Sequence, residues 1–186
     1  MSEPLRNCTA ALSGFDAVVP RVQPDQWSNA SPCDGWCARD VVAHQASVLA
    51  AVTKIAESGE MAPPAEFDLG DDPVAAWNEV RDRVLAALDR PGVLQQEGQF
   101  FFGKPTVDEL IGFVAWDPLG HSWDLAKATG QRVHADPAVA QHVVDTITPM
   151  ADMLRKYGVM GDPIAVPDDA DAMTRYLGLT GRDPAV

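Results

Sequence analysis

The sequence predicts an all-α protein that folds as a bundle of helices. Five stretches of the chain carry apolar residues at spacings of three and four, which is the period of a helix with one buried face. The strict alternation of apolar and polar residues that is typical of half-buried strands is scarce. Aspartate followed by proline precedes some of these stretches, and glycine follows others, as expected at helix starts and ends.

The first expected helix runs from about Pro4 to Val19, and the second from about Cys37 to Ala56. In the second helix, His44 occupies a position in the apolar stripe that would otherwise hold an aliphatic residue. The other members of that stripe are Val41, Val48, Ala51 and Ile55. A third helix is expected from Asp72 to Leu88, because Pro73 suits the first helical position and an apolar stripe follows it.

The fourth helical region spans Val107 to about Thr129. Pro118 lies inside it, and a proline within a helix removes one backbone hydrogen bond and clashes with the preceding turn. A kink or bulge is therefore expected near Val114 to Pro118. A fifth helix is expected over residues 136–158, where an aspartate and a proline suit the start, and a short sixth helix over residues 169–177.

Two linkers between the expected helices are distinctive. The segment ESGEMAPPAEFDLG, between the second and third helices, is long enough to cross over a bundle end or to edge a pocket, so a long crossover loop is expected. The segment QFFFGKPT, before the fourth helix, suits a short extended stretch or an apolar wall. Because the chain has no internal repeat, low-complexity tract or second-domain boundary, residues 1–186 are predicted to form a single domain.

The charge and cysteine content exclude several classes of protein. The chain carries 27 acidic and 14 basic side chains, and its net charge of −13 repels nucleic-acid phosphates and anionic lipid headgroups. No stretch approaches the roughly 20 apolar residues of a membrane span, and no secretory leader is recognisable. The three cysteines form an odd set that indicates free thiols rather than a disulfide framework. A cytoplasmic protein that binds neither nucleic acid nor membrane is therefore expected.

The most informative pattern for function combines Asp117 and His121 with the distant His44. Residues four apart share one face of a helix, so a carboxylate oxygen and an imidazole nitrogen from one helix could reach a single cation. His44 would approach the same cation from a neighbouring helix. Three ligands of this kind leave coordination positions open for chemistry, as in catalytic metal sites.

Each of these residues also has a simpler interpretation. A buried histidine such as His44 can bond to a backbone carbonyl or an acidic side chain without any metal. Asp117 is followed by Pro118, which is the pattern of an N-cap followed by proline at the first helical position, so the aspartate could only cap a helix. Spacing alone leaves both interpretations of Asp117 open.

Other side chains near this pattern have less specific expected roles. Asp124 lies one turn beyond His121 and could orient its imidazole by accepting a hydrogen bond from the second ring nitrogen; a solvent-facing or salt-bridge role is equally open. Trp36 is expected to anchor the start of the second helix rather than to contact substrate. Cys33 could border the site, but the default expectation for a free cysteine is a buried small hydrophobe. The sequence contains no nucleophile-elbow motif and no glycine-rich phosphate loop.

Two separated motifs carry a resemblance to a known family. The segment W-x3-SPCDGWCARDVVAHQ from Trp27 to Gln45 and the segment DPLGHSWDLAKATGQ from Asp117 to Gln131 resemble the DinB-like metalloproteins. The branch they resemble most is that of the mycothiol-dependent maleylpyruvate isomerase-like proteins of actinobacteria. The tail LGLTGRDP is similar to that branch as well, so the resemblance covers essentially the whole chain. It implies a four-helix bundle of DinB-like type, with additional short helices and the crossover loop.

The resemblance also implies a chemistry. It assigns His44, Asp117 and His121 as ligands of a divalent metal, with zinc the first expectation and nickel or iron as alternatives. It implies a low-molecular-weight thiol, mycothiol, as cosubstrate and a small electrophile as substrate of a transferase or isomerase. The isomerase itself has an additional C-terminal domain for which 186 residues leave no room, so isomerisation of maleylpyruvate is not expected.

Three further possibilities stay open. The same metal could activate water, which would make the protein a metal-dependent hydrolase of a small molecule. The bundle could instead belong to a non-catalytic small-molecule or metal-binding stress protein that has lost the chemistry. A homodimer is also compatible with the sequence, which does not determine the oligomeric state.

Overall fold

The computed structural model describes residues 1–60, 65–98 and 103–185. In these ranges the chain is helical apart from turns, loops and two isolated bridges, which confirms the all-α fold class. The α-helices are α1 (Glu3–Val18), α2 (Ala38–Ser58), α3 (Pro73–Leu88), α4 (Val107–Val114), α5 (Trp116–Ala128), α6 (Pro137–Ile147), α7 (Ala151–Lys156) and α8 (Ala172–Leu179). Three short 3-10 helices are η1 (Val19–Arg21), η2 (Val93–Gln95) and η3 (Thr148–Met150).

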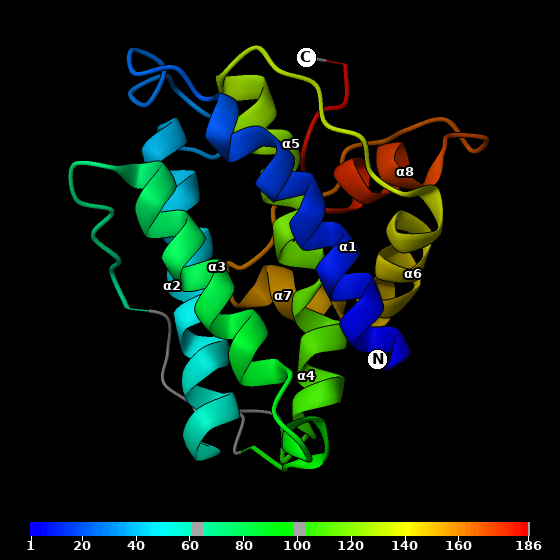
Figure 1. Ribbon diagram of the computed structural model, residues 1–186. Coiled ribbons are helices and arrows are strands. Elements are labelled where there is room, and N and C mark those ends of the chain that lie inside the picture. The colour runs from blue at the N-terminus through cyan, green and yellow to red at the C-terminus, as the bar shows by residue number, and fades with distance from the viewer. Residues whose placement is uncertain (61–64, 99–102, 186) are drawn as a thin grey trace.

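The bundle is formed by α1, α2, α3 and the consecutive pair α4 and α5, which together occupy the place of one interrupted helix. Helix α1 packs against both α4 and α5, while α2 packs against α3 and α5. Helices α6 and α8 pack against each other at one side of this bundle (Figure 1). Helix α5 thereby becomes the central element, because it contacts both α1 and α2.

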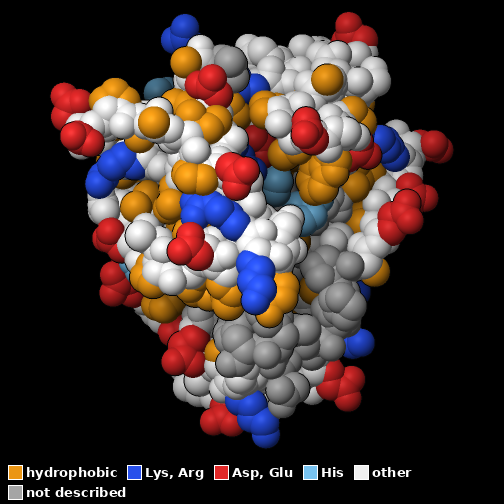
Figure 2. Space-filling model, turned by 180° about the vertical axis from the view of Figure 1, so that it is seen from behind, with side chains coloured by type: hydrophobic (Ala, Val, Ile, Leu, Met, Phe, Trp, Pro, Cys, Tyr) orange, Lys and Arg blue, Asp and Glu red, His pale blue; other side chains and the backbone are white. Residues whose placement is uncertain are grey.

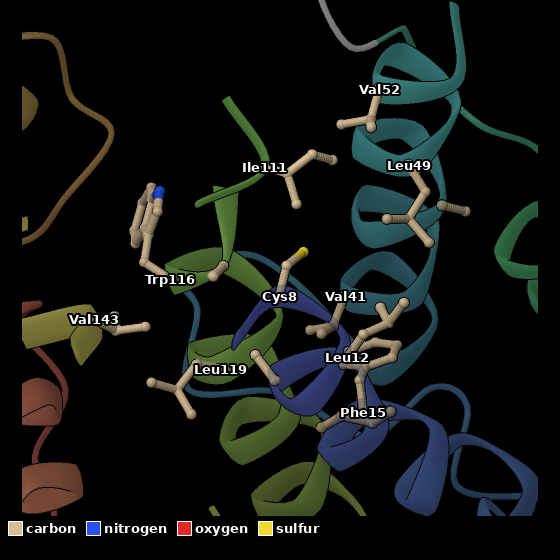
Figure 3. Close-up of a cluster of buried hydrophobic side chains, with 14 of the residues drawn as sticks. Cys8, Leu12, Phe15, Val41, Leu49, Val52, Ile111, Trp116, Leu119 and Val143 are labelled. Atoms are coloured by element: carbon tan, nitrogen blue, oxygen red, sulfur yellow. The ribbon is translucent and has the colours of Figure 1, made fainter. Parts of the chain in front are cut away.

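The core fills the space between α1, α2 and the α4–α5 pair. Figure 3 shows buried side chains from these helices converging, among them Leu12, Leu49 and Ile111. Phe15 is fully buried and its ring lies 4.7 Å from that of Trp77, which joins α1 to α3. Full burial of one such side chain stabilises a fold by about 1.5–3 kcal/mol. Together, the buried side chains of Figure 3 stabilise the packing of α1, α2 and the α4–α5 pair.

The interruption expected in the fourth helical region is confirmed, and it falls at Ala115, between α4 and α5. Restarting the helix at Trp116 places Pro118 in the first turn of α5. Backbone N–H groups in a first turn have no hydrogen-bond partner within the helix, so a proline at this position removes no helical hydrogen bond.

Two details of the helix predictions are wrong. The fifth helix is not continuous to residue 158, because α6 ends at Ile147 and the 3-10 turn η3, which contains Pro149, separates it from α7. The buried stripe of α2 is also shifted: Val48 is half-buried, whereas Gln45 and Leu49 are buried. The second difference brings Gln45 into the interior, next to His44.

The crossover loop connects α2 to α3, and Leu69 near its end is buried. The aromatic residues of QFFFGKPT fall within residues 99–102, outside the described residues, so the wall suggested for them stays a prediction. Among the helices described, none has both the length and the apolar character needed to cross a membrane.

Candidate metal centre

The packing of α2 against α5 brings together the three side chains singled out by the sequence. His44 lies in the second turn of α2, and Asp117 and His121 lie one turn apart at the start of α5. One ligand-competent atom from each residue lies within 4.8 Å of the other two. Two helices far apart in sequence thus present two imidazoles and one carboxylate to a common point.

The separations between these atoms fit the edges of a metal coordination sphere. The Nε2 atom of His44 lies 3.4 Å from Oδ2 of Asp117, and Nε2 of His121 lies 3.5 Å from Oδ1 of the same carboxylate. These distances exceed the 2.7–3.2 Å or so of a well-formed hydrogen bond. Two ligands held about 2.1 Å from a tetrahedral zinc ion stand about 3.4 Å apart, so both imidazole–carboxylate separations are compatible with such an ion.

Asp117 is not a helix cap. The N-cap of α5 is Ala115, which makes no side-chain capping bond, and Asp117 lies inside the helix. Its carboxylate accepts a hydrogen bond from the side-chain amide of Gln45 on α2. Because Gln45 is fully buried, this contact holds the carboxylate between the two helices and facing the two histidines.

The charges at the centre are strongly coupled. Burial alone would raise the pKa of Asp117, but electrostatic attraction to His121 and to His44 holds that pKa well below its usual range. Burial alone would lower the pKa of His121, but the carboxylates of Asp117 and Asp124 raise it well above its usual value. Each group of this buried pair therefore favours the charged form of the other.

Asp124 supports His121 from behind. Its Oδ2 atom accepts a hydrogen bond from Nδ1 of His121 at 2.8 Å, and the side chain is fully buried, which excludes a solvent-facing role. Arg182 from the C-terminal segment donates to the same carboxylate. Burial would raise the pKa of Asp124, but His121 and Arg182 lower it to about 2. This contact leaves Nε2 of His121 directed toward Asp117, as for a metal-ligating histidine oriented by a carboxylate.

Trp36 lies just before α2, where an anchor of the helix start is expected, and it also lies against both histidines. Its ring is stacked on that of His121 with centroids 5.8 Å apart, and lies 5.0 Å from the ring of His44. The residue precedes α2 by two positions, and no periodicity argument assigns a direction to a side chain in such a turn.

The cysteines differ in their relation to the centre. Cys33 is half-buried, with Sγ 3.2 Å from Oδ2 of Asp124 and 3.9 Å from Nδ1 of His121, so it borders the site rather than filling the core. Cys8 lies in the core, where burial raises the pKa of its thiol to about 12. Cys8 is therefore no nucleophile near neutral pH.

A cleft of about 840 Å³ opens beside His44. It lies between the start of α2 and the end of the crossover loop, and its lining includes Trp36, Arg39, His44, Ser47, Phe67 and Leu69. The His44 side chain is 30% exposed and that of His121 only 9%, so access to the centre is from the His44 side. Figure 2 shows histidine side chains recessed in a hollow of the molecular surface.

Comparison with known families identifies one that matches most of the chain. The family model described as the mycothiol maleylpyruvate isomerase N-terminal domain matches residues 8–126, which include all three candidate ligands. An uncharacterized protein found in two strains of Mycobacterium tuberculosis is 31% identical over 138 residues, covering 74% of this chain and 74% of that protein.

One solved structure is similar in fold. The crystal structure of a histidine-to-alanine mutant of the mycothiol-dependent maleylpyruvate isomerase superposes with a TM-score of 0.60 at 16% sequence identity. The similarity covers 90% of this chain and 75% of that chain. At this level of identity the comparison establishes the shared helical fold and not the reaction.

Proposed function

Because the chain belongs to the mycothiol maleylpyruvate isomerase N-terminal domain family, we propose that it is a metal-dependent enzyme that uses a low-molecular-weight thiol. The thiol is mycothiol, and its partner is a small electrophilic molecule that is either substituted or isomerised. The observation that carries the proposal is the donor set of His44, Asp117 and His121 at the side of an open cleft: each imidazole Nε2 lies 3.4–3.5 Å from the Asp117 carboxylate, and the three ligand atoms lie within 4.8 Å of one another.

The residues at the centre suit a divalent metal of intermediate softness. Two imidazole nitrogens and one carboxylate oxygen are common ligands of zinc, and nickel or iron are accepted by the same set. A bound metal of this kind lowers the pKa of a coordinated thiol or water, and so supplies a nucleophile near neutral pH. His44, Asp117 and His121 would hold the ion, and three protein ligands leave a position for the exogenous group.

The surrounding side chains prepare the centre for this role. Gln45 holds the carboxylate of Asp117, and Asp124 holds the ring of His121, so two of the three ligands are fixed before any metal binds. Trp36 packs against both imidazole rings and so restricts their orientation. The cleft beside His44 is large enough for a drug-sized molecule, which suits a thiol cosubstrate together with a small electrophile.

The metal content of the protein tests the proposal directly. Protein purified without an affinity tag is expected to contain about one divalent metal ion per chain, and His44→Ala and His121→Ala are each expected to lose it. Elemental analysis measures this content. Equally little metal in the wild type and in both variants would rule out the metal-dependent function.

Turnover assays then identify the nucleophile. With electrophilic substrates, activity that depends on added mycothiol supports the thiol-dependent function. Activity of the metal-loaded protein that is independent of thiol would instead identify a metal-dependent hydrolase, with water as the nucleophile. A cytoplasmic location, the single domain and a homodimer stay predictions.

A further inference from the structure

The C-terminal segment reaches the candidate metal centre at Asp124, which contacts the Nδ1 side of the His121 ring. Helix α8 packs against α6, and the chain after it turns back toward α5. The backbone N–H of Arg182 donates to the carbonyl of Leu177 at 2.8 Å, which closes this turn. The turn places the guanidinium of Arg182 against Asp124, 58 residues earlier in the sequence.

Arg182 and Asp124 form a geometrically specific pair. Nε of Arg182 donates to Oδ1 at 2.9 Å and Nη2 donates to Oδ2 at 2.7 Å, so each carboxylate oxygen has its own donor. The Asp124 side chain is fully buried, and that of Arg182 is 14% exposed. A fork of this kind fixes the plane of the carboxylate as well as compensating its charge.

Two glycines make room for this arrangement. A Cβ atom at Gly120, on α5, would collide with the hydroxyl of Tyr176 and lie 3.1 Å from Cζ of Arg182. Gly181 has a φ of +84°, and a Cβ there would lie 2.9 Å from the backbone of residues 161 and 162. The absence of a side chain at Gly120 therefore lets Tyr176 and Arg182 of the C-terminal segment pack against α5. Gly181 allows the turn that directs the Arg182 side chain toward Asp124.

Tyr176 provides the second attachment of the tail to α5. Its hydroxyl donates to the backbone carbonyl of Trp116 at 2.7 Å, and the side chain is fully buried. Trp116 directly precedes Asp117, so the tail contacts α5 beside one candidate ligand and, through Asp124, behind another. The tail is thus packed on the segment that carries two of the three candidate ligands.

We propose that Arg182 is a positioning residue of the metal centre: it fixes the Asp124 carboxylate, which in turn holds His121 with Nε2 directed at the ligand position. This inference rests on the proposed function. Cys33 also contacts Asp124, but a thiol is a weak donor and has only one proton. Among the described residues, Asp124 forms ion pairs with His121 and Arg182, so without Arg182 its carboxylate loses one charged partner and the fork that fixes its plane.

The test compares Arg182→Ala with Arg175→Ala. Arg175 also lies on the C-terminal segment, where it donates a hydrogen bond to Gln141 on α6; within the described ranges of the chain, its side chain has no hydrogen bond to α5. Loss of a partner that orients a ligating histidine lowers metal affinity by about 10- to 100-fold, which is the loss expected for Arg182→Ala. Arg175→Ala is expected to stay within about threefold of the wild type. Zinc affinity is measured by competition with a chromophoric chelator.

A second measurement uses the protein without metal. The proton on Nδ1 of His121 is hydrogen-bonded and buried, so nuclear magnetic resonance is expected to detect it as a slowly exchanging downfield signal in the wild type and in Arg175→Ala. The signal is expected to disappear in Arg182→Ala through exchange with water. Arg182→Lys keeps the positive charge but loses the two-donor geometry, so its His121 proton signal is expected to be weaker than that of the wild type but still detectable. If Arg182→Ala does not fold, Arg182→Lys replaces it in both measurements.

The outcomes separate this inference from the proposed function. If wild-type protein binds none of zinc, nickel and iron, the proposed function fails, while the signal of the His121 proton still decides whether Arg182 positions that ring. If Arg182→Ala keeps both the wild-type zinc affinity and the proton signal, Arg182 has no positioning role. A loss of zinc affinity that is equal in Arg175→Ala would also overturn the inference, because it would reflect packing of the tail alone.

Discussion

The two histidines of the candidate metal centre lie in opposite surroundings. His121 is buried, and a chain of contacts through Asp124 to Arg182 holds it from behind. His44 is 30% exposed beside the cleft, and its contacts at the centre are to Asp117 and the rings of Trp36 and His121. The difference indicates that the two sides of the centre have different roles. The residues of α5 fix the geometry of the centre, and the side formed by α2 leaves it open to molecules that enter the cleft.

The largest effect is expected from removing the buried histidine. His121→Ala should abolish metal binding and also lower the free energy of unfolding of the metal-free protein by about 3–5 kcal/mol, because Asp117 and Asp124 would keep buried charges without their shared partner. His44→Ala should abolish metal binding at a cost of no more than about 1 kcal/mol. Urea unfolding of both variants with a chelator present measures the difference. Equal stability losses would contradict the division between the two sides.

Filling the space at Gly120 should produce the next largest effect. Gly120→Ala would push Tyr176 and Arg182 away from α5 and is expected to destabilise the protein by about 2–3 kcal/mol. Gly14→Ala is the matched control, because a Cβ at that position of α1 would meet its nearest neighbours at an ordinary 3.6 Å. The control should be neutral or stabilising by up to about 1 kcal/mol. Thermal unfolding measures the difference, and a lower melting temperature is expected for Gly120→Ala than for Gly14→Ala.

The buried carboxylates should make the metal-free protein sensitive to acid. The pKa of Asp124 is lower in the folded protein, at about 2, than its ordinary value of 3.8, so its stabilising contribution is present above about pH 4 and is lost as pH falls toward 2. A shift of this size corresponds to about 2 kcal/mol. The free energy of unfolding, followed by urea titration at a series of pH values, should fall more steeply in the wild type than in Asp124→Asn. Parallel curves would show that Asp124 contributes nothing to the acid sensitivity.

The smallest effect is expected at Trp36, on the open side of the centre. Trp36→Ala removes the contacts with both imidazole rings and should weaken zinc binding by about 1 kcal/mol, or roughly fivefold, whereas Trp36→Phe keeps an aromatic surface and should bind nearly as well as the wild type. Chelator competition measures both. An effect of Trp36→Ala as large as that of His121→Ala would show that the α2 side contributes to geometry and not only to access.

Several features of the fold follow from local sequence signals. The apolar periodicity and the Asp-Pro starts place most helices within a few residues, and Pro118 marks the region in which α4 gives way to α5. The fifth helix was harder to predict, because its apolar spacing continues across residues 148–150 while Pro149 interrupts the backbone there. Periodicity also misplaced the buried face of α2, since a shift of one position along a helix turns a side chain by about 100°.

The sequence alone shows that Asp117 and His121 share a helical face and that His44 interrupts an apolar stripe, because each is a property of one helix. That Asp117 faces Gln45 and His44 instead of capping α5 depends on the tertiary structure, because these two neighbours come from α2. The same holds for Trp36 above the rings and for Arg182 behind Asp124. Their contacts join segments distant in sequence, and helical spacing carries no information about which side chain of another segment fills the space across an interface.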